Sequence, residues 1–182
     1  SSETINSGTV NGNYTATQSD GGNLLNITER DSGGNPRNRY DYMTHTLNFN
    51  ISAGDVVSLF ANAWVTGGSE DAFEFEVSIN GGSYQPVFTV SSTDTNNIQS
   101  AVLGSNISGS VSVRVQDSDQ TLGNRSHQTI VIDHMFIHVE NSVGGTIPND
   151  PTGLTATADS SSQISITWTD NAINESGHTI ER

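Results

Sequence analysis

The sequence predicts an all-β fold in the form of a sandwich, and two observations support this prediction. No window of the 182-residue chain keeps a helical period, whereas short runs that alternate apolar and polar residues recur along it. These runs end in clusters of Asn, Ser, Thr and Gly, which favour turns. About eight or nine such runs precede residue 142, a number typical of a β-sandwich.

The expected strands follow one another along the first 141 residues. After an opening strand they are the segments 23–29, 42–51, 56–65, 72–79, 84–90, 98–103, 110–116 and 129–140. Segment 72–79 alternates most cleanly, with Phe73 and Phe75 on the inward face and Glu74 and Glu76 on the outward face. The Asn-Gly-Gly that follows predicts a tight hairpin turn, because Asn and Gly tolerate positive φ.

Charge is the strongest bias in the composition. The chain holds 20 Asp and Glu against 6 Arg and no Lys, and its net charge is −14. Nucleic acids and anionic membrane surfaces need clustered basic residues, so both are disfavoured as partners, and cations are favoured. No run reaches the roughly 18 apolar residues of a membrane helix, so membrane insertion is not expected. The absence of cysteine fits a secreted bacterial protein in its mature or trimmed form, and equally many cytoplasmic proteins.

The composition changes after residue 141. Residues 142–151 carry Gly, Pro and Asn and are expected to form a linker. Alternating residues then follow in two short runs: Pro151, Leu154 and Ala156, then Ile164, Ile166 and Trp168. On these residues, segment 152–182 resembles the opening of a fibronectin type III domain. The truncated segment is roughly a third of such a domain, which implies a longer multidomain parent that continues for about 50 to 60 residues.

Two carboxylates fall on rows that are expected to face the core. Asp133 alternates in phase with Val131 and Met135, and Glu29 continues the row of Ile27. Burying a carboxylate is costly unless it is paired, hydrogen-bonded or bound to a metal. A Ca²⁺ ion, which takes six to eight oxygen ligands, would satisfy both. Alternatively, Glu29 pairs with Arg30 or Arg39, and Asp133 caps a loop at a strand edge.

Three parts of the sequence carry a family resemblance. They are ITERDSGG (27–34), FEVSINGGSYQPV (75–87), and the closing pair VSVRVQDSD (111–119) and GNRSHQTIVIDHMFI (123–137). Through them, residues 1–141 resemble the galactose-binding-like, jelly-roll carbohydrate-binding modules of secreted bacterial enzymes. The resemblance implies a jelly-roll β-sandwich, a structural Ca²⁺ between Glu29 and Asp133, and a polysaccharide or oligosaccharide as ligand.

A further acidic stretch, DSDQTLGN (117–124), also offers metal ligands. Asp117, Asp119 and Asn124 are oxygen-bearing side chains near a glycine, as in a calcium-binding loop. The spacing differs from that of an EF-hand, and the terminal Glu is absent. An Asp-rich turn is the commoner explanation of such a stretch, so Asp117 and Asp119 are candidate metal ligands with a competing structural role.

Few aromatic residues are available to contact a sugar. Tyr40 and Tyr42 lie on the polar side of their strand, and Trp64 alternates out of phase with its apolar neighbours. An exposed aromatic ring gives a flat platform for a sugar ring, and a cation such as Arg114 on an outward row can bond its hydroxyls. These four residues are the predicted ligand site. The alternatives are that Trp64 belongs to the core and that the two tyrosines are ordinary surface residues.

The sequence contains no catalytic motif. It has no cysteine nucleophile and no Gly-x-Ser-x-Gly turn. We therefore expect a non-catalytic, calcium-stabilised accessory domain that anchors a secreted bacterial multidomain enzyme to polysaccharide, with the catalytic domain covalently linked in the parent protein. The alternative is a structural or adhesive calcium-binding module of a cell-surface or secreted protein. A small hydrolase or lyase on the same fold is the least favoured hypothesis.

Overall fold

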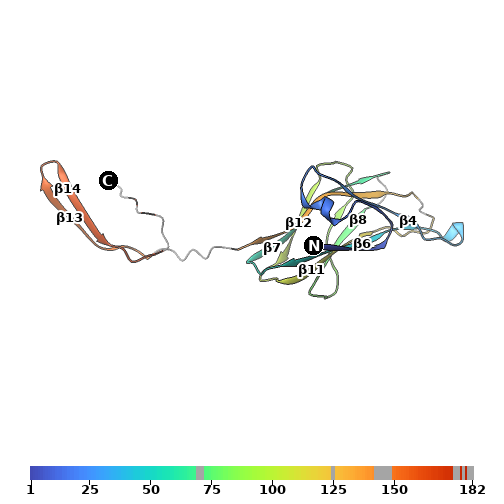
Figure 1. Cartoon of the computed structure of the whole chain (residues 1–182), viewed down its shortest axis with the longest axis horizontal. Helices are drawn as coiled ribbons and strands as arrows, with labels where there is room; N and C mark the ends of the chain where they lie inside the picture. The colour runs from blue at the N-terminus through green and yellow to red at the C-terminus, as the bar shows by residue number, and fades with distance from the viewer. Residues whose placement is uncertain (69–71, 124–125, 142–148, 174–176, 178, 180–182) are drawn as a thin grey trace. The chain divides into compact units, whose positions relative to one another are not determined.

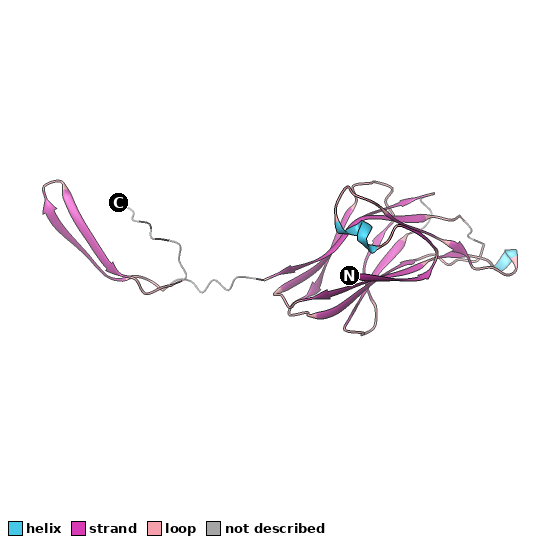
Figure 2. Cartoon of the chain, viewed as in Figure 1, coloured by secondary structure: helices cyan, strands magenta, loops and turns pink. Residues whose placement is uncertain are grey.

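The computed structural model describes residues 1–68, 72–123, 126–141, 149–173, 177 and 179 (Figure 1). The chain forms two compact units, Ser1–Asn141 and Ser142–Arg182. Strands dominate both units, and the helical segments drawn in Figure 2 are short 3₁₀ turns. Within the described residues, no helix is long and apolar enough to cross a membrane.

The first unit consists of two five-stranded antiparallel sheets. The first sheet has the order β1 (Ser2–Ser7), β6 (Thr44–Ile51), β11 (Gly109–Asp117), β8 (Phe73–Ile79) and β9 (Gln85–Val90). The second sheet has the order β10 (Ile98–Gly104), β7 (Val56–Thr66), β12 (Thr129–Glu140), β3 (Leu25–Thr28) and β2 (Thr9–Asn11). The chain crosses repeatedly from one sheet to the other, as in a jelly roll. The predicted all-β sandwich is confirmed.

The core lies between the inward faces of the two sheets. Phe73 and Phe75 of β8 and Val113 of β11 are fully buried on the first sheet, and Leu59 and Ile132 are fully buried on the second. These positions alternate with polar residues, as the sequence pattern predicts. Burying each such side chain contributes roughly 1.5–3 kcal/mol, so the alternation fixes which face of each strand turns inward.

The position of Asp133 differs from the prediction. Along β12 the pairing with β7 shifts between Ile132 and His134, so Asp133 is the extra residue of a β-bulge. Because the bulge resets the alternation, the core row runs through Ile132 and then Met135. Val131 lies on the other face, and Asp133 is not part of the core row that the sequence predicts.

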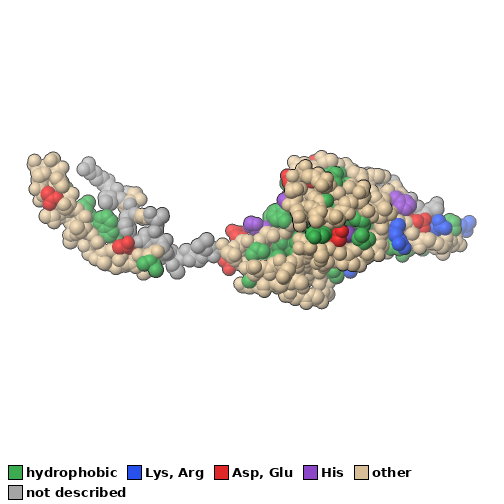
Figure 3. All heavy atoms as spheres, viewed as in Figure 1, with side chains coloured by type: hydrophobic (Ala, Val, Ile, Leu, Met, Phe, Trp, Pro, Cys, Tyr) green, Lys and Arg blue, Asp and Glu red, His purple; other side chains and the backbone are tan. Residues whose placement is uncertain are grey.

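A short hairpin projects from one end of the first unit. It consists of β4 (Arg30–Asp31) and β5 (Asp41–Tyr42), joined by residues that include the 3₁₀ turn η2 (Pro36–Asn38). A second 3₁₀ turn, η1 (Tyr14–Gln18), packs against β12 and is capped by Asn13, whose side chain accepts a hydrogen bond from the backbone N–H of Thr15. The arginine side chains gather at the end where β4 lies (Figure 3).

The second unit contains one described hairpin. It pairs β13 (Thr152–Ser160) with β14 (Gln163–Thr169), and all residues of both strands are exposed. Leu154, Ile164 and Ile166 lie among the exposed large apolar residues of the chain. Two strands are a small part of any sandwich, and residues 142–148 of the predicted linker lie outside the described residues.

Candidate functional site

The outer face of the first sheet is lined by polar side chains, of which Thr46, Glu76 and Ser78 are less than 9% exposed. Its central three strands bring together cross-strand rows of outward residues, which we call the polar face: Thr44–Gln116–Glu74, Thr46–Arg114–Glu76 and Asn48–Ser112–Ser78. Every one of these residues alternates with a buried apolar or core-facing neighbour, so the pleat of the sheet holds the whole set on one side. The polar face carries two carboxylates and one guanidinium.

Arg114 organises the centre of the polar face. Its Nε and Nη2 atoms both lie 2.6 Å from Glu76 Oε2, and Glu76 is only 8% exposed. The guanidinium carbon also lies 4.0 Å from the centroid of the Tyr84 ring. A cation over an aromatic face contributes about 0.5–2 kcal/mol, depending on its desolvation. Arg114 is therefore held between a carboxylate and a partly exposed aromatic ring.

Tyr84 is the aromatic residue of this site that the sequence interpretation missed. It follows the Asn-Gly-Gly turn between β8 and β9, and Asn80 in that turn has a positive φ of 51°. The turn returns the chain beside β8, which brings Tyr84 over Arg114 of the next strand. The hairpin signal was present in the sequence, but the pairing of β8 with β11 was needed to place Tyr84 and Arg114 together.

Other hydrogen bonds fix the polar side chains around this centre. Gln116 Nε2 donates to Glu74 Oε2 at 3.3 Å, and Ser112 Oγ donates to Asn48 Oδ1 at 2.8 Å. Each of these bonds joins neighbouring strands. The polar face thus presents amide, hydroxyl and carboxylate groups in fixed positions beside an aromatic ring, which is the combination that orients a polar, ring-shaped ligand.

The four predicted ligand residues do not form one site. Arg114 lies at the centre of the polar face. Tyr42 lies two residues before Thr44 and so just outside the polar face. It is on the same side of the chain as Thr44, because the intervening Met43 is fully buried. The ring centroids of Tyr40 and Tyr42 are 5.9 Å apart, and the Arg30 guanidinium lies 5.1 Å from the Tyr42 ring.

Trp64 lies elsewhere. It is a residue of β7 in the second sheet, it pairs with Val131 of β12, and it is 8% exposed. The core cluster between the sheets does not include it. Trp64 therefore sits buried on the far side of the sandwich from Arg114 and does not extend the polar face.

Glu29 and Asp133, the predicted pair of calcium ligands, are well separated. Glu29 is 2% exposed and lies beside Gln128, whose backbone N–H donates to Glu29 Oε2 at 2.8 Å. Asp133 lies five residues after Gln128, which is a separation of about 16 Å at the rise of a β-strand. One ion therefore does not bridge the two carboxylates.

Asp133 is a largely buried carboxylate at the β-bulge. Its side chain is 7% exposed, and Oδ2 accepts a hydrogen bond from the backbone N–H of Gly21 at 3.1 Å. Its Oδ1 is buried and has no hydrogen-bond partner among the described residues. A buried carboxylate oxygen without a partner is costly unless it is hydrogen-bonded or bound to a cation. No group of three or more His, Asp or Glu in the described segments is arranged to hold a metal.

Asp117 and Asp119 organise the loop after β11. Asp117 Oδ1 accepts from the backbone N–H of Asp119 at 2.8 Å, and Asp119 Oδ1 accepts from the backbone N–H of Thr121 at 2.9 Å. These are bonds from a side chain to the backbone two residues on, as in Asp-rich turns. The geometry matches the structural alternative to a metal site, and Asn124 lies outside the described residues.

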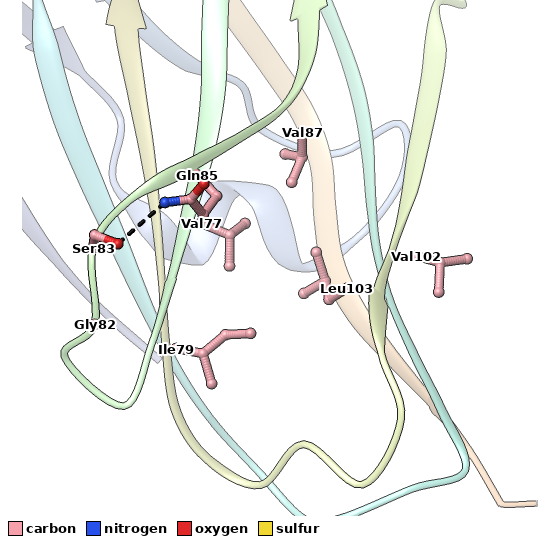
Figure 4. Close-up of a pocket in the computed structure, with 8 residues that line it drawn as sticks. All are labelled: Val77, Ile79, Gly82, Ser83, Gln85, Val87, Val102 and Leu103. Carbon is pink, nitrogen blue, oxygen red and sulfur yellow. Dashed lines mark hydrogen bonds between the residues drawn. The ribbon is translucent and has the colours of Figure 1, made fainter.

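One pocket opens between the edges of the two sheets (Figure 4). It has a volume of about 310 Å³ and is lined by Val77, Ile79, Gly82, Ser83, Gln85, Val87, Val102 and Leu103. Its only drawn polar contact is a bond of 3.1 Å from Gln85 to Ser83, and Val102 points away from it. The aliphatic lining offers few groups to a polar ligand, so the pocket is not part of the candidate site.

No protein-family model and no curated protein matches the sequence. Among solved structures, the chain is similar to TmCBM61 in complex with β-1,4-galactotriose, with a TM-score of 0.47 and 14% identity over 76% of this chain and 87% of that chain. It is also similar to carbohydrate-binding modules from the β-sandwich superfamily, with a TM-score of 0.45 and 16% identity over 75% of this chain and 55% of that chain.

A third similar structure is the N-terminal CBM22-1–CBM22-2 tandem domain from Paenibacillus barcinonensis Xyn10C. The TM-score is 0.44, with 15% identity over 85% of this chain and 46% of that chain. Likenesses of this strength carry neither residue roles nor ligands over to this chain, so its function has to be argued from its own surface.

Proposed function

We propose that residues 1–141 form a non-catalytic carbohydrate-binding module whose ligand lies across the polar face. The observation that carries the proposal is the partly exposed Tyr84 ring stacked on Arg114, which is itself held by Glu76. An aromatic ring fixed from below can stack against the apolar face of a sugar. The neighbouring amide, hydroxyl and carboxylate groups suit the sugar hydroxyls.

The charge of the polar face favours a neutral glycan. Glu74 and Glu76 outnumber Arg114, and Arg114 is already paired with Glu76. The chain as a whole carries a net charge of −14. A polysaccharide rich in carboxylates would meet repulsion both at the site and from the overall field, whereas a neutral chain would not. The proposed ligand is therefore a neutral polysaccharide or oligosaccharide.

The biological role proposed for the module is to anchor a linked enzyme. A module tethered to a catalytic domain raises the local concentration of substrate without changing the active site. In this proposal the parent is a secreted bacterial enzyme, and residues 152–182 belong to a fibronectin type III-like domain. The exposed apolar residues of the β13–β14 hairpin are consistent with a unit that needs further strands to cover them.

The proposal is tested by replacing Tyr84. Tyr84→Ala removes the platform from a partly exposed position, so we expect retention on a neutral polysaccharide to fall at least tenfold while the melting temperature changes little. The measurement is affinity electrophoresis in gels that contain β-glucan, β-mannan or β-galactan. Leu122→Ala, which alters a 60% exposed loop residue, is the matched control. Unchanged retention of Tyr84→Ala would sink the proposed site, and no retention of the unaltered protein on any of the three would favour a structural or adhesive module.

We further propose that a structural Ca²⁺ is held at Asp133, with backbone carbonyls of the adjacent loop as its other ligands. The support for this is the buried Oδ1 on the β-bulge, which has no hydrogen-bond partner in the described part of the chain. We expect the melting temperature to fall in EDTA and to recover when calcium is added, and we expect Asp133→Asn to abolish that response. Glu29→Gln, made about 16 Å away, should lower stability while keeping the calcium response. A melting temperature that ignores EDTA would refute the ion site.

A further inference from the structure

The outer face of the second sheet carries a second organised array of side chains. On β7 and β12 the outward cross-strand neighbours, which we call the ring face, are Asn62–His134, Phe60–Phe136 and Ser58–His138. The bulge at Asp133 shifts the alternation of β12, so that the two histidines and Phe136 lie on the outward face. The ring face belongs to the opposite sheet from the polar face, so the two surfaces look away from each other.

The four rings of this face contact one another in a continuous row. The ring centroids of Phe60 and Phe136 are 5.1 Å apart with an interplanar angle of 5°. His134 packs on Phe136 at 4.7 Å, and His138 meets Phe60 edge-on at 6.2 Å. Each ring is held by its neighbour, so little conformational freedom remains to be lost when a ligand binds.

This row of rings is partly exposed to solvent and is flanked by polar groups. Phe136 is 37% exposed, and Ile98 of the neighbouring strand β10, which pairs with Asn62, is 65% exposed. Asn62 is 9% exposed, and its Oδ1 has no hydrogen-bond partner in the described part of the chain. Imidazole, hydroxyl and amide groups therefore border the aromatic surface. None of the six residues of the ring face is Asp, Glu or Arg, and Glu140 follows His138 at the end of the outward row.

The size of the face selects the kind of occupant. From β10 to β12 it spans about 10 Å, and from the His134 row to the His138 row it spans about 13 Å. A stable protein interface buries about 800 Å² on each partner, several times this footprint. A segment of two or three sugar rings matches the footprint, and its mixture of apolar ring faces and uncharged hydroxyls matches the chemistry.

We propose that the ring face is a second binding site for a neutral glycan. It shares the ligand class of the polar face but rests on different residues. With two sites on opposite sides of the sandwich, one module binds two glycan chains at once. Retention on an insoluble polysaccharide then exceeds that expected from either site alone, because the second contact forms at a high effective concentration.

The test uses the full 182-residue protein and three soluble probes: the β-1,4-linked hexasaccharides of glucose, mannose and galactose. Calorimetric titration should give two hexasaccharides bound per chain. Phe136→Ala and Tyr84→Ala should each reduce this to one, and the double variant should bind none. Amide shifts in ¹⁵N-labelled protein provide a second readout that requires no variant: titration should move signals on β7 and β12 as well as on β8 and β11.

The outcomes separate the two proposals. One hexasaccharide per chain, lost in Tyr84→Ala and kept in Phe136→Ala, overturns the ring face and leaves the polar face in place. Binding lost only in Phe136→Ala, with shifts confined to β7 and β12, establishes the ring face and removes the polar face. Failure of all three hexasaccharides to bind the unaltered protein overturns both.

Discussion

At the scale of single residues, the central feature of the candidate site is a cation, Arg114, that packs against the aromatic ring of Tyr84. Arg114 bonds Glu76 from the neighbouring strand through Nε and Nη2 and lies against the Tyr84 ring, so its guanidinium is engaged by two protein groups. This differs from the prediction that Arg114 contacts the sugar directly beside Tyr40, Tyr42 and Trp64. In the proposed arrangement, Arg114 holds the Tyr84 ring in place, and the ring is the group that we expect to contact the sugar.

A buried histidine makes stability depend on pH. His45 is fully buried, its Nε2 lies 3.2 Å from Glu3 Oε2, and burial lowers its pKa from the ordinary value of 6.5, with Glu3 opposing the shift. Because the pKa is lower in the folded chain than in the unfolded chain, this stabilising contribution is complete above pH 6.5 and is lost as the pH falls below it. We expect the free energy of unfolding to decrease between about pH 7 and about pH 5.5.

The matched variant for that experiment is His45→Gln. It removes the titrating group, so its unfolding free energy should be lower overall and should vary less over the same pH range. Urea denaturation at several pH values measures both quantities. An equally steep decrease in His45→Gln would assign the pH dependence to other groups.

At the scale of structural elements, irregularities in the strands place the functional groups. The bulge in β12 turns Asp133 out of the core row and brings His134, Phe136 and His138 into one outward row. The turn between β8 and β9 similarly brings Tyr84 over Arg114. A bulge or a turn changes the alternation of the side chains that follow it. Both irregularities therefore determine which side chains lie on each face of a sheet.

The β8–β9 turn offers a direct test through Asn80. Asn80 has a φ of 51°, its Oδ1 accepts from the backbone N–H of Ser110, and its Nδ2 donates to the carbonyl of Ser108, each at 3.0 Å. Asn80→Ala loses both bonds and keeps a side chain in the left-handed region, so we expect a loss of about 1–3 kcal/mol of stability. Thermal or urea unfolding measures this loss.

Asn80→Gly separates the two causes. It also loses the side-chain bonds, but glycine adopts the positive φ without strain, so the variant should be more stable than Asn80→Ala. Equal stability of the two variants would show that the backbone conformation contributes nothing and that the bonds account for the whole effect.

At the scale of the whole molecule, the two units differ in how far they are self-sufficient. Residues 1–141 enclose a core between two five-stranded sheets, whereas the described strands of the second unit form one hairpin with every residue exposed. An isolated two-stranded hairpin is marginally stable in water. The different burial of the two units predicts different resistance to a protease.

Limited proteolysis of the 182-residue chain tests this difference. We expect early cleavage between Gly144 and Asp159 and a lasting fragment that contains residues 1–141, because proteases cut exposed and locally unstable segments. Mass spectrometry of the fragments gives the cleavage sites. A second unit as resistant as the first would show that residues 142–182 are stabilised by contacts beyond the hairpin.

Much of the fold follows from local pattern, and the candidate site follows from it only in part. Glu74, Glu76 and Arg114 were placed on outward rows by alternation alone, and the structure agrees. Tyr84 was not identified, because its importance depends on a neighbour 30 residues away in sequence. Glu29 and Asp133 were predicted to bind one calcium ion because each falls on an apolar row. The register between β3 and β12 instead places Glu29 beside Gln128 and away from Asp133.

The sequence by itself determined an all-β sandwich, because alternation with a period of two and clusters of turn residues are local properties that each segment carries alone. It also determined the excess of negative charge and hence the classes of partner that are disfavoured. Only the tertiary structure decided which outward rows became neighbours, such as Arg114 beside Glu76, and where a bulge reversed the phase at Asp133. Strand pairing and register depend on contacts between segments far apart in the chain, and alternation within one strand contains no information about its partner.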